Sequence, residues 1–178
     1  MAQPGLDWVR RESAGSCDVV ALREAHEDFI ASVGELSFGA PPVGEWDAHQ
    51  VLAHIAAVDL SIASTALAVA AGQHPAYDNR ATLDAWHLRV LTERYAAIDQ
   101  LVEIVRTSGE LLCMVAEHIS SEDLEYPLPT LIVSGDTAVL DATIPLGALI
   151  EGVGQAHLPL HQEQLRALTC PEQDGGGA

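Results

Sequence analysis

Two histidines near the end of the chain, His157 and His161, stand four residues apart in a stretch with a helical pattern. Four residues are about one helical turn, so both imidazoles project from one face and could chelate one divalent metal ion. Gln164 continues this face three residues later, where it could orient a ligand or a water molecule, although packing would explain it equally well. The spacing alone is a weak signal, because most such histidine pairs are solvated or cap a helix.

His54 is the third candidate ligand. It lies in the most apolar part of an earlier helix, where Val51, Val58 and Ile62 share its face. Taken alone, a buried histidine is better explained by a hydrogen bond to a carbonyl or hydroxyl group. Three inward-facing imidazoles on two helices are costly to bury without partners, and one divalent cation would satisfy all three. The sequence therefore predicts a metal site formed by His54 and the later pair.

Asp59 follows His54 by five residues and is a candidate hydrogen-bond acceptor for a metal-bound histidine, or a catalytic base. A solvated helix charge or a dimer-interface residue explains it about as well. His26 lies among charged residues of the first helix, so we expect it to be exposed. The remaining histidines are explained by helix ends, a helix surface or a loop: His49, His74, His87 and His118.

The elements that must position these residues follow from hydrophobic periodicity and helix-end signals. We expect helices over residues 16–36, 48–71, 81–118 and 145–168, and a short hairpin within residues 124–144. Asp47 and Gln50 form the pattern of a capping box at the start of the second helix. Ser108 and Gly109 are expected to bend or end the third helix, and Pro159 to kink the fourth.

The composition agrees with packed helices, because alanine is abundant and aromatic residues make up only 4% of the 178 residues. We therefore predict an all-α fold, a four-helix bundle with a short β-hairpin before the last helix. The length suits one domain, residues 1–170, followed by a disordered tail at 171–178.

The charge of the chain bears on its partners. With 26 acidic residues and a formal net charge of −18, the protein would repel nucleic acid and anionic membranes. Three scattered cysteines indicate neither a disulfide framework nor a cysteine zinc site. The first residues lack the apolar core of a signal peptide, and polar residues interrupt the apolar run at 51–71. A cytoplasmic protein without nucleic-acid or membrane partners is expected.

Two motifs carry a family resemblance: W-D-x-x-Q-V-L-A-H-I at Trp46–Ile55 and H-x-x-x-H-x-x-Q-L at His157–Leu165. Together they resemble the DinB/YfiT-like superfamily, and more narrowly the N-terminal domain of the mycothiol-dependent maleylpyruvate isomerases, over about residues 16–170. The resemblance implies a metal-binding helical bundle, often a homodimer, with His54, His157 and His161 as the ligands of zinc or nickel. It also implies a low-molecular-weight thiol, such as mycothiol, as cosubstrate.

The leading functional prediction is a metal-dependent thiol S-transferase, or an isomerase-like enzyme, acting on a small thiol and an electrophile. A bundle that binds metal and a small ligand without catalysis, in stress response or sensing, is the alternative. A purely structural role, with the histidines satisfied internally, is a third possibility because a shared fold does not transfer chemistry.

Overall fold

The computed structural model of the chain describes residues 17–34 and 36–169. The tail predicted to be disordered, residues 171–178, lies outside the described residues, as does the expected start of the first helix at Ser16.

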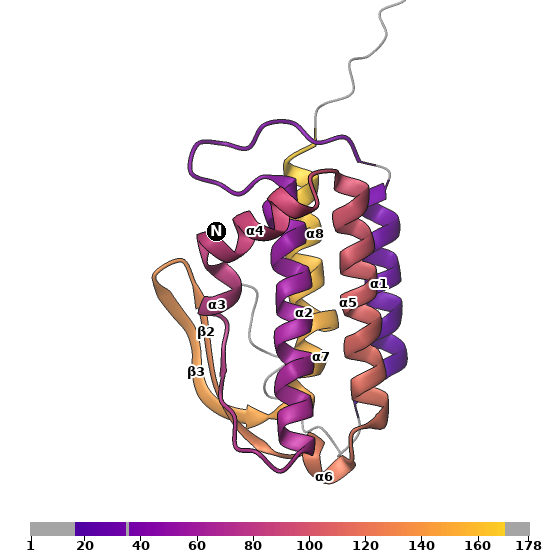
Figure 1. Cartoon of the computed structure of the whole chain (residues 1–178), viewed down its shortest axis with the longest axis vertical. Coiled ribbons are helices and arrows are strands. Elements are labelled where there is room, and N and C mark those ends of the chain that lie inside the picture. Colours follow the sequence, from indigo (N-terminus) through magenta and orange to yellow (C-terminus); the bar gives the residue numbers. More distant parts are fainter. Residues whose placement is uncertain (1–16, 35, 170–178) are drawn as a thin grey trace, which may run out of the picture.

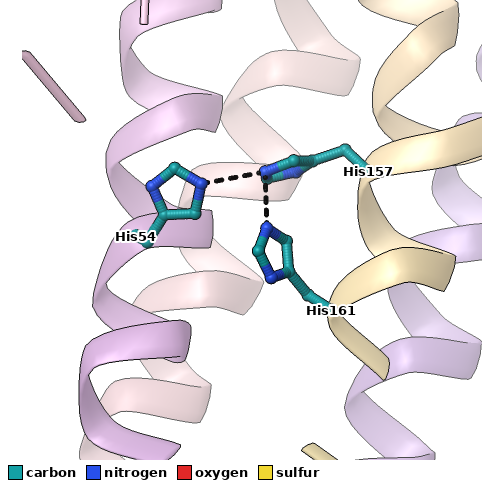
Figure 2. Close-up of side chains that lie close together, drawn as sticks. All are labelled: His54, His157 and His161. Carbon is teal, nitrogen blue, oxygen red and sulfur yellow. Dashed lines mark hydrogen bonds between the residues drawn. The ribbon is translucent and has the colours of Figure 1, made fainter. Parts of the chain in front are cut away.

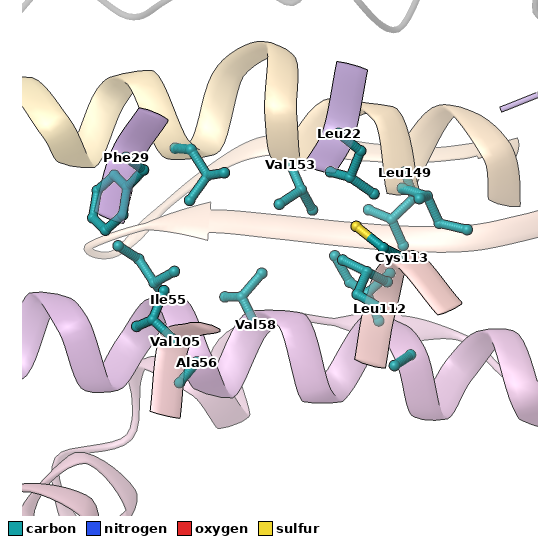
Figure 3. Close-up of a cluster of buried hydrophobic side chains, with 14 of the residues drawn as sticks. Leu22, Phe29, Ile55, Ala56, Val58, Val105, Leu112, Cys113, Leu149 and Val153 are labelled. Carbon is teal, nitrogen blue, oxygen red and sulfur yellow. The ribbon is translucent and has the colours of Figure 1, made fainter. Parts of the chain in front are cut away.

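Four long helical segments lie side by side and enclose the core (Figure 1). They are α1 (Val19–Gly34), α2 (Ala48–Ala70), α5 (Ile98–His118) and a composite last helix made of α7 (Leu146–Gly152), the π-helical segment η2 (Val153–His157) and α8 (Leu158–Ala167). Each contributes apolar side chains to one buried cluster, with Phe29, Ile55, Val105 and Leu149 among them (Figure 3). Burial of these stripes is what holds the helices together.

The prediction of an all-α four-helix bundle is wrong, because the described chain also contains a three-stranded mixed sheet and several short helices. Strands β2 (Pro127–Ser134) and β3 (Thr137–Pro145) form an antiparallel hairpin, and β1 (Tyr77–Asp78) pairs with β2 in parallel. Asn79, which follows β1, stabilises the pairing of β1 with β2. Its Oδ1 accepts from Val133 N–H (2.8 Å) and its Nδ2 donates to Val133 O (3.0 Å). A two-residue strand is too short to leave a periodic signal in the sequence.

The prediction of one long third helix at 81–118 is also wrong. The chain forms three helices there, α3 (Arg80–Leu83), α4 (Ala85–Arg94) and α5. Asp84 has an extended backbone (ψ 126°) and caps α4, accepting from the N–H groups of Trp86 and His87. Ser108 and Gly109, expected to bend the helix, lie within continuous α5. A short helix, α6 (Ser121–Leu124), connects α5 to the hairpin.

Helix α2 starts with the capping box that the sequence predicts. Asp47 Oδ1 accepts from Gln50 N–H (2.8 Å), and Gln50 Oε1 accepts from Asp47 N–H (3.0 Å). Its end lies beside Gly72, whose positive φ of 74° favours glycine. Among the described residues, α2 is the helix that is long and apolar enough to cross a membrane. However, 67% of its most apolar 18-residue segment is buried by the rest of the fold.

The last helix contains an irregularity just before Pro159. Leu158 N–H donates to Val153 O, five residues back, so η2 holds one residue more than an α-helical turn. Val153 (2% exposed) and Leu158 (1% exposed) both occupy the core across this turn. Pro159 then lies in the first turn of α8, a position that tolerates proline.

Candidate metal centre

The structure brings His54, His157 and His161 together, from α2, η2 and α8 (Figure 2). His157 Nε2 lies 3.2 Å from His54 Nε2 and 3.1 Å from His161 Nε2. Three imidazole nitrogens around a tetrahedral zinc ion are about 3.3 Å apart, since each metal–nitrogen bond is about 2.0–2.1 Å. The spacing of the three Nε2 atoms therefore suits a single divalent ion.

The protonation of two imidazoles follows from their outer hydrogen bonds. His54 Nδ1–H donates to the backbone carbonyl of Thr82 at 2.9 Å. His161 Nδ1–H donates to Gln164 Oε1 at 2.8 Å. A neutral imidazole that carries its proton on Nδ1 has a free lone pair on Nε2. Two lone pairs therefore point toward His157 Nε2.

His157 completes the cluster but is not satisfied within it. Its Nδ1 is enclosed and has no hydrogen-bond partner. With a proton on Nε2, it could donate to one neighbour only, and Nδ1 would remain a buried acceptor without a donor. With a proton on Nδ1, three lone pairs would face one another. A cation between the three Nε2 atoms removes that conflict, so these histidines could hold a divalent metal ion.

Burial keeps the three imidazoles in the neutral form that binds metals. It lowers the pKa of His54 to about 3, with a smaller contribution from the neighbouring His161. The same cause places the pKa of His157 well below its usual value and lowers that of His161. Trp46 covers His54, with the two ring centres 5.1 Å apart.

The two additional residues proposed from the sequence occupy different places. Gln164 orients a candidate ligand, His161, through the hydrogen bond described above. Asp59 is completely buried, but its Oδ2 bonds to His26 and Ser108 and not to a candidate metal ligand. The direct contact between Asp59 and the metal site that its spacing from His54 suggested is therefore not formed.

The prediction that His26 is exposed is wrong, since only 4% of it is accessible. His26 Nδ1–H donates to Leu22 O (3.0 Å), while Nε2 lies 3.3 Å from Asp59 Oδ2. Ser108 Oγ–H donates to the same carboxylate oxygen at 2.9 Å. Burial lowers the pKa of His26, but the hydrogen bond and charge of Asp59 outweigh it and leave this pKa raised. Burial also raises the pKa of Asp59, so both partners favour the protonated form. The result is a buried hydrogen-bonded pair between α1 and α2, bonded to α5.

Sequence reasoning missed three residues that support these clusters: His26, Thr82 and Ser108. A signal existed for His26, because it falls between Leu22 and Phe29 on the buried stripe of α1. Thr82 acts through its backbone carbonyl, and Ser108 through a contact between two separate helices. Neither leaves a trace in local sequence.

A surface depression of about 400 Å³ lies apart from the histidines, between α3 and the turn of the hairpin. Its lining consists of Arg80, Leu83, Asp84, Val133, Gly135 and Asp136. Arg80 is already paired with Asp78. The depression therefore adds no residues to the metal centre.

No protein-family model, curated protein or solved structure matches the chain. The features of the chain that bear on its function are the geometry of the three histidines and the two sequence motifs.

Proposed function

We propose that the protein is a DinB-like, divalent-metal-dependent enzyme that transfers a low-molecular-weight thiol to an electrophilic substrate. Its ligands are His54, His157 and His161, and its ion is zinc or nickel. The observation that carries the proposal is the convergence of three Nε2 atoms at 3.1–3.2 Å, two of them with Nδ1–H already held by acceptors.

Three neutral ligands leave a divalent ion its full positive charge, which would lower the pKa of a thiol or water bound to it. The contribution of the chain is orientation. Thr82 O and Gln164 Oε1 hold two imidazoles with their lone pairs toward the centre. Fixed ligands of this kind avoid reorganisation when the ion binds.

Mycothiol is the first thiol to test, for two reasons. It is the cosubstrate in the family that the two motifs resemble. The abundant alanine and absence of lysine also fit a high-GC genome, in which mycothiol would be expected. The overall reaction breaks the thiol S–H bond and the bond between the electrophilic carbon and its leaving group, and forms an S–C bond. The leaving group departs with its electron pair, as halide from an aryl halide, and the thiol proton goes to it or to solvent.

Elemental analysis of the purified protein tests the metal site. We expect about one zinc or nickel ion per chain, and its loss in His157→Ala because two ligands hold the ion far more weakly than three. The matched control is His118→Ala, at the exposed end of α5, which should keep the ion. Unchanged metal content in His157→Ala would contradict the proposal.

Thiol consumption tests the reaction. Mycothiol, bacillithiol and glutathione are each incubated with an activated aryl halide and the metal-loaded protein, and His157→Ala serves as the blank. Turnover above this blank with at least one thiol is expected. Stoichiometric metal without turnover of any thiol would favour the alternative, a bundle that binds metal and a small ligand without catalysis.

A further inference from the structure

Two enclosed side-chain atoms among the described residues have no hydrogen-bond partner, Asp59 Oδ1 and His157 Nδ1. They are chemically complementary. A carboxylate oxygen only accepts hydrogen bonds, and His157 Nδ1 carries a proton whenever Nε2 binds a metal ion. An unpaired buried polar atom costs about 1–3 kcal/mol, so two such atoms in one interior call for an explanation.

His157 is also the exception among the three candidate ligands. His54 and His161 each donate Nδ1–H to an oxygen of the chain, whereas His157 does not. A histidine that binds a metal through one nitrogen almost always donates from the other to a carboxylate, a carbonyl or a water. The metal centre is therefore incomplete by one outer acceptor.

Asp59 lies on the Gly154 side of the histidine cluster. The last helix and α2 run in opposite directions (Figure 1), so residues after His54 on α2 lie level with residues before His157.

Helix α1 links the two groups at this level. A Cβ atom built on Gly154 would lie 3.3 Å from Ala25 Cβ, so α1 packs directly on η2. His26, the next residue, lies with its Nε2 3.3 Å from Asp59 Oδ2. His26 and Ser108 both bond to Oδ2, which leaves Oδ1 without a partner from α1 or α5.

We propose that Asp59 is a positioning residue of the metal centre, with its Oδ1 accepting the Nδ1–H of His157 through one bridging water. A buried water is stable where it has at least two polar partners, and this pair supplies them. All three imidazoles then have an outer acceptor, and the hydrogen bond fixes the ring of His157 and makes it a more basic ligand. The inference rests on the proposed metal site.

Zinc affinity, measured by competition with a chromophoric chelator, tests the proposal. Asp59→Asn retains the size of the side chain and removes its charge, and we expect affinity to fall about 10–100-fold. The matched control is Ser108→Ala, which also removes a hydrogen bond from this carboxylate, but at Oδ2. Its zinc affinity should stay within about threefold, even if the fold is less stable.

The wild-type protein supplies a second measurement that requires no variant. In the zinc-loaded protein labelled with ¹⁵N-histidine, His157 Nδ1–H should give a slowly exchanging NMR signal with a cross-peak to a buried water. A rapidly exchanging signal would overturn the inference, as would equal zinc affinities of Asp59→Asn and Ser108→Ala. If the wild type binds no zinc, the proposed function fails together with this inference.

Discussion

Two groups of buried histidines in one interior reach opposite states. In the cluster of His54, His157 and His161, bases face bases, and burial lowers the pKa of each. At His26 the facing group is the carboxylate of Asp59, and the pKa is raised. The comparison shows that burial alone does not decide the charge of a histidine. The nearest partner decides whether the pKa of a buried histidine is lowered or raised.

The backbone makes room for the two groups in different ways. A Cβ atom at Gly109 would lie 2.3 Å from His26 Cδ2, so the ring occupies space that only glycine leaves on α5. The cluster of His54, His157 and His161 instead relies on the π-helical segment η2, which carries His157. The contact between His26 and Asp59 therefore depends on the absence of a side chain at Gly109. The three-histidine cluster depends on the additional residue in η2.

The largest effect is expected from removing the carboxylate that separates the two states. Asp59→Ala leaves two buried groups, His26 Nε2 and Ser108 Oγ, without the carboxylate that they contact. At about 1–3 kcal/mol for each unsatisfied group, the free energy of unfolding should fall by about 2–5 kcal/mol. Urea unfolding of the metal-free protein measures this loss. Glu117→Ala, which removes an exposed ion pair with Arg23, should cost at most about 1 kcal/mol. Equal losses would show that the contact between His26 and Asp59 does not stabilise the fold.

Filling the space beside His26 should have the next largest effect. In Gly109→Ala the new methyl group displaces the imidazole, and we expect a loss of about 1–3 kcal/mol from overpacking. Gly34→Ala is the matched control, because no atom lies within 4 Å of its new Cβ. That change should be neutral or stabilising by up to about 1 kcal/mol. A neutral Gly109→Ala would contradict the tight fit of His26, as assessed by denaturant midpoints.

The pH dependence of the metal-free protein tests the ligand cluster. Because the pKa of His54 is about 3 in the folded state and about 6.5 when unfolded, the unfolded chain takes up a proton first as the pH falls. Stability is then lost from about pH 6.5 downward, by roughly 2 kcal/mol at pH 5 for His54 alone. His157 and His161 act in the same direction.

His26 acts in the opposite direction. Its raised pKa contributes stability that is present below about pH 6.5 and is lost as the pH rises through the folded-state value. Asp59, whose pKa burial raises, acts in the same direction as His26. Unfolding free energies at pH 7 and pH 5 should show a net decrease, since three groups with a lowered pKa oppose two with a raised pKa. His54→Gln should reduce that decrease. A protein more stable at pH 5 than at pH 7 would refute the neutral state of the cluster.

The smallest effect is expected at the outer acceptor of His161. Gln164→Ala removes the oxygen that holds its Nδ1–H, and metal affinity should fall about tenfold without a matching loss of metal-free stability. Gln162→Ala, two residues away on the same helix, points elsewhere and should leave metal affinity unchanged. Isothermal titration with zinc compares them. Equal affinities would assign Gln164 to packing.

The convergence of the three histidines could be predicted from the sequence, because each lies on a helix whose periodicity is clear and whose start is marked. Their role as metal ligands stays a prediction. The capping box at Asp47 sets the phase of α2, and this phase turns His54 inward. The hydrophobic pattern does not predict a polar contact between segments that are distant in the sequence, such as that between His26 and Asp59. His26 was assigned to the surface from its charged neighbours, although the Leu22–Phe29 stripe includes it.

The prediction of the fold class was wrong for a related reason. The two-residue strand Tyr77–Asp78 forms because it pairs with β2 and because the side chain of Asn79 bonds to the backbone of β2. Likewise, α3, α4 and α5 share one apolar pattern, and the separation depends on a single cap at Asp84 and on the non-helical backbone of Tyr95. Periodicity describes which face is buried, whereas these features depend on single residues and on tertiary pairing.

The additional residue in η2 has a consequence for packing. Across this segment the buried positions advance by five residues, from Val153 to Leu158, and His157 is left beside the core stripe instead of within it. Leu158 therefore packs in the core, while the adjacent His157 is free to face the other two histidines. A regular α-helix of the same length would place His157, four residues after Val153, at the core position that Leu158 occupies. Deleting the exposed Gln155 would instead remove the additional residue and keep Leu158 in the core.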